Sequence, residues 1–298
     1  MESVLSTWAG LSSHFIGECF DTAKPYLDQQ FERMDPYVRF VSAQLFIDCH
    51  LSSESSLILV REAKEWDADM IIRSVMEGTI KYTFLMSGES SEVRQKAFEY
   101  WELLPNFSAI RHHNRALAIL NEVSNPDDPE WIPFKKLLLT QEEIDCLRNG
   151  TNKKDRSLLE QKWSFSEITK NFTQSESSGL KLLSHLAHGY EMSSHLIHKD
   201  GDGVGMVWER YGRDEREQSA VKLGHCARIV SDVCSFSKFR ICQLLRFCGQ
   251  KTDIIKDIED RYAILFEELG KAGKNFTEVE YGQELNQSVR QPRNHRDI

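Results

Sequence analysis

Apolar residues recur along most of this chain at spacings of three and four, which places them on one face of an α-helix. Runs that alternate between apolar and polar residues, as a half-buried β-strand would, are few, and the chain has only seven prolines. The pattern therefore predicts an all-α protein, built as a multi-helix bundle with two long core helices.

Capping signals set the expected ends of these helices. Asp35 can cap free N–H groups and Pro36 suits a first helical position, so a helix is expected over 36–49. The serines at 52–56 predict a turn that opens a second, very long helix ending near residue 86. Further helices are expected over 92–123 with an interruption near Pro105, from 140 to 150, from 164 onward, from 180 to 199, and over 214–247 and 252–269.

A chain of 298 residues could form one large domain or two small ones, and we expect one. A polar connector is expected at about 149–156 within a single all-helical domain over 1–272. Residues 273–298 lose apolar periodicity and are expected to form a flexible polar tail.

Charge and cysteine usage narrow the function classes. The formal net charge of -9 argues against a surface that coats nucleic acid, although a local basic site could still bind RNA. Seven scattered cysteines without a CxxC pair are typical of reduced thiols in a cytoplasmic protein. We find no run of about 18 apolar residues, so no membrane partner is expected. Neither GxxxxGK[ST] nor GxGxxG occurs, and no cofactor is expected.

An arginine and a glutamate interrupt the second, very long helix. At about 100° per residue, the apolar side chains between 70 and 86 point in nearly every direction, which is typical of a helix buried on most sides. Arg73 and Glu77 lie one turn apart within this stretch. They could form an internal ion pair that fixes the helix register, or they could face a cleft and hold an anion or a proton donor.

A second polar row lies on the histidine-rich helix before Asp200. Tyr190, Ser194 and His198 recur every fourth residue and therefore share one row. Ser194 and His198 lie at the border with the apolar face, where a side chain can be partly desolvated and still reach solvent. That position suits a general base.

Three interpretations of the polar face stay open. It could be an ordinary solvated surface. It could bind zinc, iron or manganese, because His188, Glu191 and His195 share the face and supply imidazole and carboxylate ligands. It could also carry metal-free acid–base chemistry, with His198 transferring a proton and Arg73 stabilising negative charge.

The order of these motifs resembles that of an uncharacterised bacterial family of all-helical proteins, known only as a domain of unknown function. The resemblance rests on R-S-x-x-E in a long helix, a tryptophan segment at 162–164 and Y-x-x-x-S-x-x-x-H, and it covers about 65–200. Many relatives carry arginine directly after the tyrosine, in a spacing similar to the Rx4-6H motif of HEPN ribonucleases, which cleave RNA without a metal. This chain has Glu191 there, and a carboxylate repels phosphate.

The resemblance implies a HEPN-like fold and a metal-independent ribonuclease, or a nuclease-derived effector of bacterial stress or phage defence. It assigns His198 as acid and base, Arg73 as the phosphate-binding group and Glu77 as the group that orients Arg73. Tyr190 and Ser194 are their implied hydrogen-bond partners.

Two other functions remain as alternatives. One is a non-catalytic helical interaction or scaffold protein, and the other is a metal-binding hydrolase that uses the histidine-rich helix. HEPN-like folds often pair, and the apolar helix at 221–247 could serve a homodimer or a partner protein.

Overall fold

The computed structural model describes the backbone of residues 1–148, 150–185 and 187–290, and the side chains of these ranges except 187–192 and 283–290. Every regular element in these ranges is a helix, which confirms the all-α prediction. The order is α1 Glu2–Leu27, α2 Pro36–Arg61, α3 Glu65–Leu85, α4 Ser90–Phe98, the π-helix η1 Glu99–Leu103, α5 Leu104–Glu122, the 3-10 turn η2 Pro129–Trp131, α6 Ile132–Lys135, α7 Gln141–Arg148, α8 Lys153–Lys162, α9 Phe165–Thr173, α10 Ser178–His185, α11 Ala187–His198, α12 Gly201–Tyr211, α13 Glu215–Phe247, α14 Asp253–Arg261 and α15 Ala263–Arg290.

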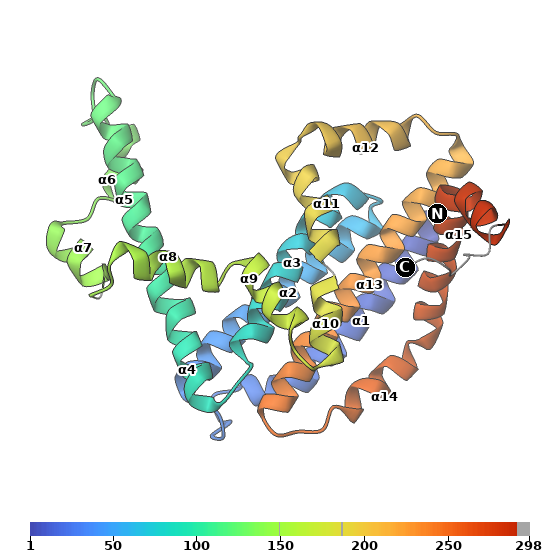
Figure 1. The fold of residues 1–298 in the computed structure, drawn as a ribbon, viewed down its shortest axis with the longest axis horizontal. Coiled ribbons are helices and arrows are strands. Elements are labelled where there is room, and N and C mark those ends of the chain that lie inside the picture. The colour runs from blue at the N-terminus through green and yellow to red at the C-terminus, as the bar shows by residue number, and fades with distance from the viewer. Residues whose placement is uncertain (149, 186, 291–298) are drawn as a thin grey trace, which may run out of the picture.

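The core lies among the long helices α1, α2, α3, α13 and α15 (Figure 1). α13 packs against α1, α3 and α15, while α2 packs against α1 and α3. Side chains such as Phe15, Ile80 and Phe236 are at most 1% exposed. Burial of each such side chain stabilises the fold by roughly 1.5–3 kcal/mol. No helix within the described ranges carries an apolar run long enough to cross a membrane.

The break between the second and third helices lies later than the sequence predicted. The turn expected at 52–56 is wrong, because α2 continues to Arg61 and the chain turns at Ala63, whose φ is 56°. Ser53 is buried and donates to the carbonyl of Cys49 (2.7 Å), while Ser56 donates to the carbonyl of Ala68 (3.3 Å). Serine hydroxyls satisfied in this way stay inside a helix instead of ending it.

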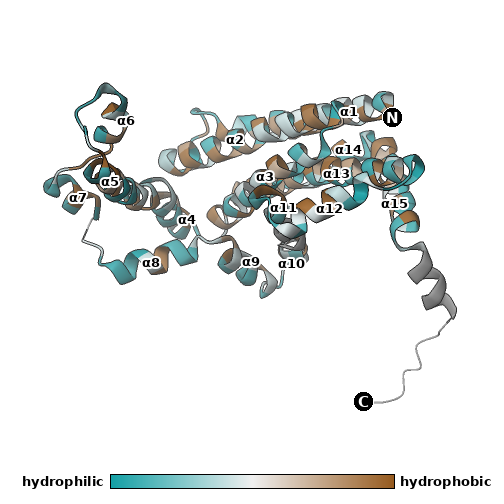
Figure 2. Cartoon of the chain, turned by 90° about the horizontal axis from the view of Figure 1, so that it is seen from above, coloured by the Kyte–Doolittle hydropathy of each residue, from teal (hydrophilic) through white to brown (hydrophobic). Residues whose placement is uncertain are grey.

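Residues 104–162, which we name the arm, project from the bundle as α5 to α8 (Figure 1). The predicted interruption near Pro105 is present, and it takes the form of η1 between α4 and α5. α8 has no buried residue and is mostly hydrophilic in Figure 2. The arm therefore adds little to the core.

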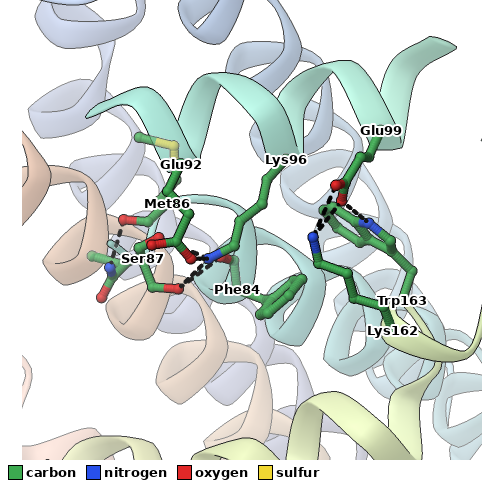
Figure 3. Close-up of polar contacts among 9 residues, drawn as sticks. Phe84, Met86, Ser87, Glu92, Lys96, Glu99, Lys162 and Trp163 are labelled. Carbon is green, nitrogen blue, oxygen red and sulfur yellow. Dashed lines mark hydrogen bonds and ion pairs between the residues drawn. The ribbon is translucent and has the colours of Figure 1, made fainter. Parts of the chain in front are cut away.

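Two polar clusters lie close to the point where the arm leaves the bundle (Figure 3). In one, Lys96 Nζ donates to the carbonyl of Ser87 (2.9 Å), pairs with Glu92 (2.7 Å) and lies 4.4 Å from the ring centroid of Phe84. In the other, Glu99 accepts hydrogen bonds from Lys162 Nζ and Trp163 Nε1 at the junction of α8 and α9. The first cluster holds α4 against the end of α3, and the second ties the end of α8 to η1.

Helices occupy parts of the two segments that were expected to be a polar connector and a tail. α15 continues through residue 272 and remains helical to Arg290, with a kink at Tyr281 (φ -126°, ψ 17°), so the tail expected from 273 is wrong for 273–290. Residues 291–298 lie outside the described ranges. The connector expected at 149–156 is limited by α8, which Asn152 caps by accepting from the backbone N–H of Asp155.

Candidate ligand-binding site

The helices that carry the predicted residues pack against each other. α11 lies against α3, as the prediction of facing helices requires. On α3, Arg73 and Glu77 are half-buried, and Glu77 accepts from Lys81 Nζ at 2.7 Å. On α11, Ser194 is half-buried and His198 is exposed. The side chain of Tyr190 lies outside the described ranges, and the meeting of the five residues stays a prediction.

The end of α11 holds a histidine–carboxylate pair. His195 Nδ1 lies 2.7 Å from Asp200 Oδ2, and the other oxygen of Asp200 caps α12 by accepting from Gly203 N (3.0 Å). The hydrogen bond from Gly203 and then that with His195 lower the pKa of the Asp200 carboxyl.

The same pair lies in a group of side chains that could hold a metal ion. Ligand atoms of His195, Asp200 and Asp202 lie within 4.8 Å of one another, whereas the side chains of His188 and Glu191 lie outside the described ranges. The hydrogen bonds of Asp200 explain the cluster as the N-terminal cap of α12.

A cavity of about 770 Å³ lies between α3, α12, α13 and α15. Apolar and aromatic side chains form much of its wall, among them Trp66, Phe266 and Phe276. Gly270 and Gly273 also line it, and a Cβ atom built on either would meet nothing within 4 Å. These two glycines therefore leave space open along the α15 wall.

Charged side chains from α3 and α13 form one cluster in this cavity wall. Asp69 is 3% exposed, pairs with Arg228, and has Oδ2 3.5 Å from His225 Nε2. Arg228 Nη1 also donates to Asp232 Oδ2 at 3.0 Å. Because His225, Arg228 and Asp232 are three and four residues apart, one face of α13 presents them all to α3.

Burial and charge decide the protonation states in the cluster. Burial opposes ionisation of Asp69, but the interaction with His225 and the charge of Arg228 outweigh it and lower the pKa of Asp69 to about 2. Burial lowers the pKa of His225, against the opposing effect of Asp69, and so favours the neutral imidazole. His225 Nδ1 is buried and has no hydrogen-bond partner among the described residues. An ionised carboxylate thus lies beside a neutral imidazole.

Arg210 on α12 lines this cavity and has no bonded counter-charge among the described residues. Its Cζ lies 5.4 Å from the ring centroid of Trp66 and 6.0 Å from that of Phe276. Within the described part of the chain, its guanidinium makes no hydrogen bond or ion pair, and burial lowers its pKa. Five N–H donors on a half-buried charge therefore remain available to a ligand.

A second arginine fixes α12 across the cavity. Arg213 Nε and Nη2 donate to Glu209 at 2.7 and 2.9 Å, and Nη2 also donates to Glu280 on α15 at 3.2 Å. Glu280 is bound by Arg213 and makes no hydrogen bond or ion pair with Arg210 among the described residues, although its charge partly opposes the effect of burial on the pKa of Arg210. The linkage holds the end of α12 against α15, which keeps Arg210 over the two rings.

The comparisons with known proteins found no match. No family model, no curated protein and no solved structure matches this chain. The resemblance of the R-S-x-x-E and Y-x-x-x-S-x-x-x-H motifs to the uncharacterised helical family therefore stays a prediction.

Sequence reasoning did not select the residues of the cavity cluster. Asp69 lies in the same helix as Arg73, but its partner Arg228 is 159 residues away, and no local pattern joins them. One signal was available, since His225, Arg228 and Asp232 share a face of a helix that is otherwise largely apolar there. Arg210 lies on α12, a glycine-rich helix for which the sequence predicted no element.

Proposed function

We propose that this protein binds a small amphipathic organic anion in the cavity between α3, α12, α13 and α15. One observation carries the proposal: Arg210 is half-buried over Trp66 and Phe276, and its guanidinium has no protein acceptor among the described residues. A cation in such a place is stabilised by an anionic ligand group, because charge-assisted hydrogen bonds strengthen where water is excluded.

The lining favours a ligand with an apolar or aromatic body and one acidic group. Arg228 is already paired with Asp69 and Asp232, so the acidic group is expected at Arg210. Trp66 and Phe276 offer ring surfaces to the ligand body. His225 lies in the same wall, and Asp69 holds its ring in place.

A matched pair of probes tests this function. 1-Anilinonaphthalene-8-sulfonate is an aromatic anion, and N-phenyl-1-naphthylamine has the same ring system without the sulfonate. Calorimetric titration is expected to give one saturable site for the sulfonate. Arg210→Met is expected to weaken sulfonate binding about tenfold or more and to leave binding of the neutral probe unchanged, because it removes a charge-assisted hydrogen bond.

Two further variants separate the cavity from the surface. Gly273→Leu places a side chain in the open space of the cavity and is expected to weaken binding of both probes. Arg216→Met removes an exposed arginine outside the lining and serves as the control. Equal sulfonate affinity in the Arg210 and Arg216 variants would exclude the proposed anion site.

A second candidate is metal-independent RNA cleavage at the end of α11. It is favoured by the packing of α11 on α3 and by the carboxylate that contacts His195, one turn before His198. Cleavage of total RNA in excess EDTA is the test. The candidate requires activity that His198→Ala abolishes and that the exposed control His14→Ala retains. Inactivity of the wild-type protein or retention in His198→Ala counts against it.

A further inference from the structure

Arg240 of α13 is completely buried in the core, at 0% exposure. Its Nη1 donates to Thr79 Oγ1 on α3 at 2.6 Å, but Nε and Nη2 have no hydrogen-bond partner in the described part of the chain. Its Cζ lies 5.6 Å from the ring centroid of Phe46 on α2. A buried ionised group left in this state is costly, and the attraction of an aromatic ring offsets only part of that cost.

The charge of Arg240 has no ionised partner in the described part of the chain. The groups that act on it electrostatically are Cys49, Tyr82 and Cys19, and none is a carboxylate. Burial raises the pKa of Cys19 to about 12 and also raises the pKa values of Cys49 and Tyr82, which keeps all three neutral. Arginine itself stays protonated in proteins. The counter-charge must therefore come from outside this set.

A second buried donor lies beside the same aromatic ring. Tyr82 is 0% exposed, and its hydroxyl has no hydrogen-bond partner among the described residues. Its ring contacts that of Phe46 edge to face, with centroids 5.5 Å apart, and the charge of Arg240 acts on its phenol. Arg240 and Tyr82 thus both pack on Phe46, and Nε and Nη2 of Arg240 and the hydroxyl of Tyr82 have no acceptor among the described residues.

We propose that Arg240 and Tyr82 bind a monatomic anion, such as chloride, inside the core between α2, α3 and α13. A halide neutralises the guanidinium and accepts hydrogen bonds from both residues without needing donors of its own. Of the possible anions, a monatomic one needs the least room in a closely packed core. Neither residue lines the cavity of the proposed function, so this site is independent of it.

Thermal unfolding in sodium chloride and in sodium gluconate at equal ionic strength tests the site. A bound chloride stabilises the folded state by mass action, so the wild-type Tm is expected to rise by roughly 3 °C for each tenfold increase in chloride above the dissociation constant. Gluconate, which is too large to enter, is expected to give no such rise. Equal curves in the two salts would overturn the proposal.

Variants link the effect to these residues. Arg240→Met is expected to lose the chloride-dependent rise in Tm. Tyr82→Phe is expected to reduce that rise, because it removes one hydrogen-bond donor and keeps the guanidinium. Arg261→Met removes an exposed arginine that pairs with Glu18 and is expected to keep the rise. If Arg240→Met does not fold, the Tm of Tyr82→Phe in chloride and crystals of the wild-type protein grown in sodium bromide test the site instead. A bromide anomalous peak beside Arg240 supports the site, and its absence overturns it.

Discussion

Asp69 shows how one buried carboxyl ties two core helices together. Its two oxygens reach Arg228 and His225 on α13, and Asp232 shares the same arginine. These contacts hold the pKa of Asp69 at about 2, below its ordinary value of 3.8, even though burial acts in the opposite direction. The folded state therefore binds a proton at Asp69 less readily than the unfolded chain does, which couples stability to pH.

Asp69→Asn is expected to flatten the acid side of the stability profile. A carboxyl with a lowered folded pKa stabilises the protein fully above about pH 4, and this contribution of about 2 kcal/mol is lost as pH falls from 4 to 2. Urea unfolding at pH 7, 5 and 3 measures it. The wild-type protein should lose more free energy of unfolding across this range than Asp69→Asn.

Asp67→Asn is the matched control because it removes an exposed carboxyl from the same helix. Parallel profiles for the wild type and Asp69→Asn would show that Asp69 is not held in its ionised form by α13.

The roles of residues whose partners are close in the sequence could be predicted. The roles of residues whose partners are distant in the sequence could not. Asp35 caps α2 by accepting from Tyr37 N (2.9 Å), and Ser164 caps α9, both as the spacing indicated. Asp69 and Arg210 were missed because their roles depend on neighbours that only tertiary packing supplies. The spacing of apolar residues indicates that a helix is buried, but it does not indicate which other helix packs against it.

Helices α13 and α15 both line the cavity, and Gly224 of α13 allows them to lie close together. A Cβ atom built on Gly224 of α13 would overlap the side chain of Phe276 on α15, while one built on Gly270 meets nothing within 4 Å. The two glycines lie in helices and differ in what faces them, so they form a matched pair for substitution.

Alanine at these two positions is expected to have opposite effects. Gly224→Ala forces α13 and α15 apart and should destabilise the protein by about 1–3 kcal/mol. Gly270→Ala meets no obstacle and should stabilise it by roughly 0.5–1 kcal/mol, because alanine favours the helix. Urea denaturation compares the two. A Gly224→Ala protein as stable as the wild type would contradict the close packing of these helices.

The base of the arm depends on Glu99 at the start of η1. Its carboxylate accepts from Lys162 at 2.7 Å and from the indole of Trp163 at 3.0 Å (Figure 3). Its side chain is 9% exposed. This contact was outside the reach of sequence reasoning, since it joins residues 63 and 64 positions apart.

Glu99→Gln is expected to destabilise the junction of the arm by about 1–3 kcal/mol. The substitution removes the negative charge of the carboxylate to which both Lys162 and Trp163 donate. Hydrogen exchange should show faster amide exchange in α8 and α9 than in the wild type, with α13 unchanged. Lys170→Gln, which removes an exposed partner of Glu167 in α9, is the control. If amides in α8 and α9 exchanged at the same rate in Glu99→Gln as in Lys170→Gln, Glu99 would not hold the base of the arm.

The whole molecule combines an acidic surface with a local cation in its cavity. The net charge of -9 disfavours long-range attraction of nucleic acid, whereas Arg210 acts at short range on a ligand that has already entered the cavity. The all-α class was predictable from periodicity over the whole chain. The cavity was not, because it arises where α12, α15 and two distant core helices meet.

The most direct test of the proposed function is a crystal structure of the protein soaked with 4-iodobenzoate, an aromatic carboxylate whose iodine is located by anomalous scattering. The iodine is expected inside the cavity, with the carboxylate on the guanidinium of Arg210 and the ring against Trp66 or Phe276. An unoccupied cavity in the wild type, or equal occupancy in crystals of Arg210→Met, would contradict an anion site at Arg210.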